Sequence, residues 1–186
     1  EDLSATVGQS LAQVGEPVFS VHNAEIVVYN LATLTVGTGV TAKFASGTGL
    51  VVGYYVYGQG QANSVERGKL LVQGTGTAPV LFTAENNASG GWKGVTFGDA
   101  TDYGGLLSTL NYLILEKAGQ AQNLGGSIAA NSAGLALWNT TVTLNNLVVA
   151  RSSGAGIYSS GSAPTVKNTI VAYNTGSGLV AVSGST

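Results

Sequence analysis

The sequence predicts an all-β protein, a parallel β-helix, and two observations carry that prediction. The first is a period of 22 residues, because Gly134, Gly156 and Gly178 each open a strand-like stretch (GLALWN, GIYSSG and GLVAVS). The second is a register that holds between these glycines, since residues 144–156 match residues 166–178 position by position. A period of 20 to 50 residues is typical of a coil that stacks on itself.

Between the glycines the pattern is that of short strands. TVTLNNLVVA and PTVKNTIVAY are rich in Val, Ile, Leu and Thr, alternate apolar with polar residues, and are bounded by Ser-Gly and Asn-Thr-Gly turns. Equivalent residues should lie in register on neighbouring coils, about 4.8 Å apart. A leucine-rich repeat also admits a 22-residue period, but its ladder of leucines and its helical return segment are both missing here.

The repeat extends toward the N-terminus, with insertions. Gly94 opens an equivalent stretch, and residues 109–118 (TLNYLILEKA) match residues 143–152 (TLNNLVVARS). The longer spacing there predicts insertions near 98–107 and 118–131. Earlier still, ATLTVGTGVTAKFASGTGLVV and GKLLVQGTGTAPVLFTA predict short alternating strands separated by Gly-Thr turns, in less regular coils.

These sequence segments resemble those of a known group of β-helix proteins. The stretch from Ala32 to Ser183 resembles the right-handed parallel β-helix proteins of the pectin-lyase-like superfold. ATLTVGTGVTAKFASGTGLVV, GKLLVQGTGTAPVLFTA and GWKGVTF resemble the opening coils of its secreted and cell-surface members, and APTVKNTIVAYNTGSGL resembles their later repeats. The resemblance implies the fold and not an activity, because the superfold hosts lyases, hydrolases, tailspikes, adhesins and structural surface proteins.

The N-terminal segment, residues 1–16, is predicted to differ from the β-helix of residues 17–186. Its apolar residues follow the spacing of one helix face, which favours a helix over residues 3–14 that caps the first coil: Leu3, Val7, Leu11 and Val14. The alternative is an extended arm that adds a strand to a neighbouring subunit.

The last repeat predicts an assembly. After Gly178 the strand LVAVSGST has no return strand, so the final coil is incomplete within the sequence. Either the chain is a fragment, or another copy completes the coil. In the second case a head-to-tail contact that does not close would give a filament.

The composition restricts the partners. Charged residues make up 9% of the chain, the net charge is −2, and the lysines and arginines form no basic stripe, so a nucleic acid partner is not expected. No apolar run is long enough to span a membrane, and there is no cysteine.

The chain starts at Glu1 and lacks methionine, which favours removal of a secretion signal and an extracellular or cell-surface location. The sequons at Asn87 and Asn139 are compatible with secretion.

No catalytic residue, metal site or cofactor is predicted. The sequence has nine acidic residues, and after Asp102 the last carboxylate side chain is Glu116, so the regular repeats offer no carboxylate pair. The nearest pair, Asp99 and Asp102, is interpreted as a solvated turn and not as a calcium site. His22 has no acidic neighbour in sequence and is interpreted as structural.

Some residues favour contacts on the surface. Lys117 and Arg151 occupy equivalent positions, so their side chains should stack on one face, where they are interpreted as solubilising surface residues. Asn146 and Asn168 should form a ladder of turns, since asparagine tolerates the left-handed backbone. Tyrosines offer flat surfaces for a sugar ring or another subunit: Tyr54, Tyr55, Tyr57, Tyr158 and Tyr173.

The sequence therefore predicts a non-enzymatic extracellular structural protein, a self-assembling surface or filament subunit joined head to tail through the ends of its β-helix. The alternative is a domain that binds or degrades a polysaccharide, with a glycan as its partner. An acidic groove lined with aromatic side chains would favour the alternative, whereas buried ends would favour assembly.

Overall fold

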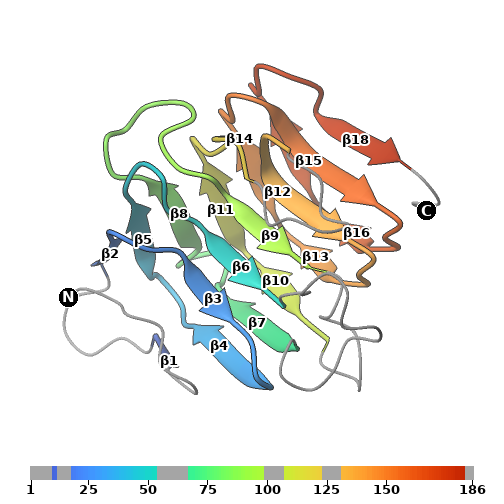
Figure 1. Cartoon of the computed structure of the whole chain (residues 1–186). Coiled ribbons are helices and arrows are strands. Elements are labelled where there is room, and N and C mark those ends of the chain that lie inside the picture. Colours follow the sequence, from blue (N-terminus) through green and yellow to red (C-terminus); the bar gives the residue numbers. More distant parts are fainter. Residues whose placement is uncertain (1–9, 12–17, 54–66, 99–106, 123–130, 183–186) are drawn as a thin grey trace.

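The described residues of the computed structural model form an all-β fold of parallel strands. They comprise residues 10–11, 18–53, 67–98, 107–122 and 131–182, and no helix occurs among them. Consequently no described segment is a helix long and apolar enough to cross a membrane. The strands form three six-stranded sheets, and successive strands along the chain visit the sheets in turn (Figure 1).

Each sheet takes every third strand. Sheet A contains β2 (Val18–Val21), β5 (Thr41–Phe44), β8 (Val80–Ala84), β11 (Leu113–Glu116), β14 (Val148–Ala150) and β17 (Ile170–Ala172). Sheet B contains β1 (Ser10–Leu11), β4 (Ala32–Val36), β7 (Gly68–Gln73), β10 (Thr109–Asn111), β13 (Thr143–Asn145) and β16 (Thr165–Lys167). Sheet C contains β3 (Ile26–Val28), β6 (Leu50–Val52), β9 (Val95–Phe97), β12 (Ala133–Trp138), β15 (Ala155–Ser160) and β18 (Leu179–Val182).

The pairing register follows the sequence repeat. In the later coils Val148 pairs with Ile170, and Ala150 pairs with Ala172, as the repeat predicts. In the earlier coils Leu110 pairs with Leu144, so the match between 109–118 and 143–152 is also a match in space. Residues 99–106 and 123–130, within the predicted insertions, lie outside the described residues.

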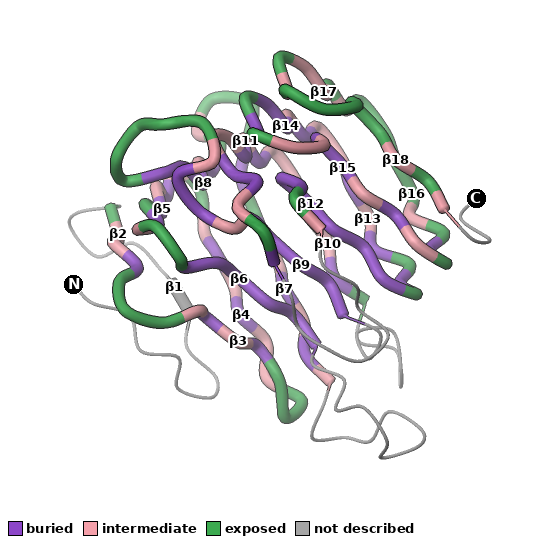
Figure 2. Tube along the Cα trace, turned by 45° about the horizontal axis from the view of Figure 1, so that its top comes forward, coloured by how far each residue is buried: buried purple, intermediate pink, exposed green. Residues whose placement is uncertain are grey.

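One apolar core runs through the middle of the three sheets. The inward side chains of successive strands stack in columns, such as Leu110 on Leu144, and both are fully buried. In the earlier coils the core is aromatic: the rings of Phe44 and Trp92 stack with centroids 4.1 Å apart, and Phe82 meets Phe44 edge-on at 5.8 Å. Exposed residues become more frequent toward β16, β17 and β18 (Figure 2).

The repeated glycines mark the places where neighbouring coils approach most closely. A Cβ at Gly134 would lie 2.6 Å from Ser152 Oγ, and one at Gly156 would lie 2.3 Å from Val171 Cγ1. Any larger residue would therefore collide with the coil that follows. At Gly178 the nearest atom to such a Cβ is 3.7 Å away, because no further coil packs there in the described residues.

The corner between sheets B and A turns through a left-handed residue in successive coils. Asn146 and Asn168 have φ of +53° and +48°, which confirms the predicted ladder of asparagine turns. The Asn146 amide reaches the preceding coil, where Nδ2 donates to Asn111 Oδ1 at 3.3 Å. Tyr112 occupies the equivalent corner with φ of +49°, although an aromatic residue rarely adopts this conformation.

The helix predicted over residues 3–14 is wrong at Ser10 and Leu11. These two residues form β1, which pairs in parallel with Thr35 and Val36 of β4. The edge of β4 offers unpaired backbone groups, and a strand satisfies them whereas a helix cannot. The rest of residues 1–16 lies outside the described residues, so the choice between a cap and an arm stays a prediction.

Two leucines three residues apart test the core. Leu110 is fully buried, and its replacement by alanine should lower the free energy of unfolding by about 2–5 kcal/mol through loss of apolar contacts. The matched control is Leu107→Ala, because Leu107 is 52% exposed and should change stability by less than about 0.5 kcal/mol. Urea unfolding of both variants measures the difference, and equal losses would contradict the assigned core.

Candidate functional site

The candidate site is the end of the coil formed by β16, β17 and β18. Each of these is the terminal strand of its sheet and pairs with one neighbour only within the described chain. Their outer edges therefore present backbone N–H and C=O groups in the direction that a further coil would take. Such edges are templates for another strand.

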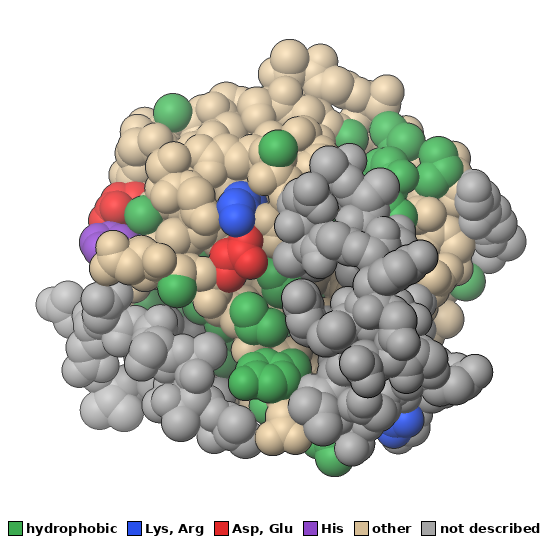
Figure 3. Space-filling model, viewed as in Figure 1, with side chains coloured by type: hydrophobic (Ala, Val, Ile, Leu, Met, Phe, Trp, Pro, Cys, Tyr) green, Lys and Arg blue, Asp and Glu red, His purple; other side chains and the backbone are tan. Residues whose placement is uncertain are grey.

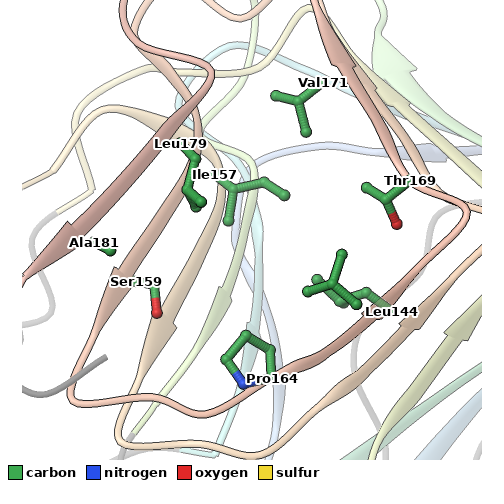
Figure 4. A pocket seen from close by; sticks show the side chains of 9 residues that line it. Leu144, Ile157, Ser159, Pro164, Thr169, Val171, Leu179 and Ala181 are labelled. Carbon is green, nitrogen blue, oxygen red and sulfur yellow. The ribbon is translucent and has the colours of Figure 1, made fainter. Parts of the chain in front are cut away.

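Inside this end lies an apolar cavity of about 230 Å³ (Figure 4). Its floor is formed by the buried residues Leu144, Ile157 and Ser159 of the preceding coil. Its walls come from the last coil: Pro164, Val166, Thr169, Val171, Leu179 and Ala181. The cavity is therefore a cross-section of the core that is left open.

The exposure of equivalent residues shows how open this end is. Val166 is 51% exposed, whereas Leu144, its partner in the preceding coil, is fully buried. Leu179 is 62% exposed, whereas Ile157 beneath it is 4% exposed. These side chains point inward by strand alternation, so they are exposed because no described coil lies over them and not because they face outward.

At the opposite end of the coil the inward positions of sheet C are buried, whereas Phe19, which heads the sheet A column that ends at Val171, is half-buried. Ile26 belongs to the same sheet C column as Leu179 but is only 7% exposed. Val21 and Val28 are 1% and 5% exposed. The sheet C column is therefore exposed at the end that carries Leu179 and buried at the end that carries Ile26.

A second cluster of interest surrounds Glu116 on the outer face of sheet A. Its carboxylate accepts hydrogen bonds from Lys117 Nζ at 2.9 Å, Arg151 at 2.7 Å and Thr83 Oγ1 at 3.1 Å. The predicted proximity of Lys117 and Arg151 is correct, and Lys117 also donates to Asn87 Oδ1. Burial raises the pKa of the Glu116 carboxyl, but its bonds to Lys117, Thr83 and Arg151 outweigh burial and hold that pKa below its usual range.

The other described carboxylates are also paired with bases. Glu85 contacts His22 Nε2 at 2.8 Å, and Glu25 contacts Lys93. Figure 3 shows acidic and basic groups side by side on a surface that is otherwise mostly uncharged. Within the described residues no three potential metal ligands gather. Each of the three described carboxylates contacts a basic side chain, and no two of these three face each other as glycoside hydrolysis requires.

Sequence reasoning placed some of these residues and missed others. The contact of His22 with Glu85 spans 63 residues, so no local pattern could reveal it. Asp99, Asp102, Tyr54, Tyr55 and Tyr57 lie outside the described residues, and their interpretations stay predictions.

Two aromatic sites stand apart from the open end. Tyr158 packs against Trp138 on the outer face of sheet C, with ring centroids 5.1 Å apart, and Trp138 is itself buried. Trp138 was not singled out from the sequence. Strand alternation could have suggested its contact with Tyr158, because Trp138 lies on the same strand face as Ala136, which pairs with Tyr158. Tyr173, at the last corner of sheet A, is 86% exposed.

Sheet B carries a shallow polar groove of about 440 Å³. Leu71, Gln73, Thr109 and Asn111 line it, together with Val72 and Gly74. The amides of adjacent strands are linked, because Asn145 Nδ2 donates to Asn111 Oδ1 at 3.0 Å. The groove is thus lined by uncharged residues, and Gln73, Thr109 and Asn111 supply hydrogen-bonding groups beside apolar Leu71 and Val72.

The two sequons differ in their surroundings. The Asn87 amide oxygen accepts a hydrogen bond from Lys117, and the Ser89 hydroxyl donates to Arg151 O. Asn139 is exposed in the turn that follows β12, with φ of +44°. Both asparagines are exposed.

No family model, curated protein or solved structure matches the chain. The three parallel sheets of stacked strands are those of a β-solenoid and agree with the expected parallel β-helix. Membership of the pectin-lyase-like superfold stays a prediction that rests on the resemblance of the sequence segments quoted above.

The low pKa of Glu116 makes its contribution to stability depend on pH. Because the folded-state pKa lies below the unfolded one, this contribution is complete above the unfolded value of about 4.3 and is lost as pH falls through the folded value. The unfolding free energy of the wild type should exceed that of Glu116→Gln at pH 7, and the gap should narrow in acid. Urea titrations from pH 7 to pH 2 measure it, and a gap that does not depend on pH would contradict the assignment.

Proposed function

We propose that this protein is a non-enzymatic structural subunit that associates with further copies of itself through the open end of its coil. The observation that carries the proposal is the apolar cavity bounded by β16, β17 and β18, with Val166 and Leu179 more than half exposed. Exposed apolar surface of this kind, rimmed by the terminal strands of three sheets, favours a protein interface. The proposal includes a right-handed coil with regular turns of 22 residues.

The remaining surface supports a structural function over catalysis. The described carboxylates are held in ion pairs with lysine, arginine or histidine, so none is free to act as an acid or base beside a second carboxylate. The low content of charge and the many Thr, Asn, Ser and Gly residues give a neutral exterior. An extracellular or cell-surface location is part of the proposal and rests on the resemblance described above.

Charge at the open end should prevent association. Leu179→Glu places a carboxylate in the apolar rim, and its desolvation should weaken self-association at least about tenfold. The matched control is Leu107→Glu, since Leu107 is also exposed but lies away from the cavity. Sedimentation of both variants over a concentration series measures the effect.

Two results would count against the proposal. One is a wild-type protein that stays monomeric at the highest concentration reached. The other is an equal effect of the two substitutions, which would show that the end is no more sensitive than any exposed leucine. If residues beyond Thr186 in a longer chain cover the cavity, the longer protein will be monomeric, and this also contradicts the proposal.

A second candidate function is the binding of a neutral glycan, and the groove on sheet B favours it. The linked amides of Asn111 and Asn145, with Gln73 and Thr109 beside them, offer donors and acceptors at the spacing of neighbouring strands. Tyr112 stands next to this row in a strained backbone conformation, which is often kept where a side chain has a function. Such a surface suits a chain of sugar hydroxyls.

A substitution at the rim of the groove tests this candidate. Gln73→Ala should weaken binding of a neutral oligosaccharide by about 0.5–1.5 kcal/mol, the contribution of one hydrogen bond. Thr38→Ala, at an exposed position outside the groove, should leave binding unchanged. Calorimetric titration with soluble oligosaccharides measures both, and an absence of binding by the wild type would rule the candidate out.

A further inference from the structure

We infer that two copies of this protein associate tail to tail, so that β16, β17 and β18 of each copy cover the open end of the other. This inference rests on the proposed function and specifies the arrangement of the partner. The sequence alone favoured a head-to-tail filament, whereas the exposure of the two ends favours a closed pair.

The decisive observation is the difference between the ends. At the tail, Val166 and Leu179 are 51% and 62% exposed, and they border an apolar cavity. At the head, Val21, Ile26 and Val28 are at most 7% exposed, and of the described inward residues there Phe19 alone is half-buried. Association gains free energy from apolar area removed from water. A tail placed on a head would cover open core on one side of the contact only, whereas a tail placed on a tail covers it on both sides.

The backbone edges are compatible with this arrangement. A two-fold axis across the end turns the three terminal strands of one copy antiparallel to those of the other. Antiparallel pairing satisfies the N–H and C=O groups of both edges and does not require the two strands to have related sequences. Each copy therefore supplies the partner strands that the other lacks.

The charge of the tail also favours a second copy over a partner of opposite charge. From Pro164 to Val182, Lys167 is the one charged residue. It projects from the outer face of sheet B, on the face opposite the inward Val166, and is exposed. The interior of the end therefore has no charge that a different, charged partner could complement, and two identical ends do not repel each other across the cavity.

A closed pair and a filament differ in mass. A two-fold contact uses both tails, so growth stops at a dimer of twice 18.6 kDa. A head-to-tail contact leaves a free tail at every step and gives an open series of masses. Sedimentation equilibrium separates the two outcomes.

Cysteine cross-linking tests the geometry directly. The natural chain has no cysteine, so an introduced thiol is the only one present. Three variants place a thiol on the outward positions of the terminal strands: Thr165→Cys, Ile170→Cys and Val180→Cys. A fourth, Val18→Cys, places it at the head of the sheet A column to which Ile170 belongs.

In a tail-to-tail pair, at least one of the three tail variants should form a disulfide on oxidation, either with itself or in a mixture with another tail variant. Antiparallel partners bring Cα atoms to about 4.5–5.5 Å, within the range of a disulfide. Val18→Cys should stay uncross-linked, alone or mixed with Ile170→Cys. Circular dichroism and the thermal midpoint should match those of the wild type, because all four side chains lie on the surface.

Each other outcome has a defined meaning. Two results would overturn the tail-to-tail arrangement but would still agree with self-association. One is a cross-link that forms only in the mixture of Val18→Cys and Ile170→Cys, and the other is an open series of masses. A dimer in which no tail variant cross-links also overturns it. A protein that is monomeric at all concentrations overturns both this inference and the proposed function.

Discussion

The structure depends on in-register stacking of parallel strands. Each inward side chain lies on its equivalent in the next coil, so one coil forms the floor on which the following coil is built. The column Leu110 and Leu144 is fully buried because coils lie on both sides of it, and the aromatic stack of Phe44 and Trp92 shows that earlier coils satisfy the same constraint with larger side chains. Glycine at 134 and 156 follows from this constraint, since a Cβ at either position would collide with the next coil.

The same constraint explains why function concentrates at the end of the coil. A stacked coil is stable only when something covers both of its faces, and the last described coil has a cover on one face alone. Its strand edges, its cavity and its exposed Val166 and Leu179 are therefore consequences of one feature, a missing neighbour. The contacts around Glu116 hold neighbouring coils together on the outer face of sheet A. They link Glu116 to Thr83, Lys117 and Arg151, which belong to three successive coils.

The parts of this picture that repeat could be predicted from the sequence, and the parts that do not repeat could not. The pairing of Val148 with Ile170 and the left-handed turns at Asn146 and Asn168 follow from the 22-residue repeat of the amino-acid sequence. The strand at Ser10 and Leu11 could not be predicted, because its partner is the edge of β4 and a helical spacing of leucine and valine gives no sign of that edge. The contact of His22 with Glu85 joins residues 63 apart in the sequence, and the burial of Ile26 and Val28 at the head is a property of packing that no local pattern encodes.

Self-association through the tail is the central claim, and amide hydrogen exchange at low and high protein concentration tests it most directly. The account predicts that amides of β16, β17 and β18 exchange fast in dilute protein and become protected as concentration rises. Amides of β11, β12 and β13, which have a strand on both sides, should be protected at every concentration. Exchange at β16, β17 and β18 that does not change with concentration would contradict the claim.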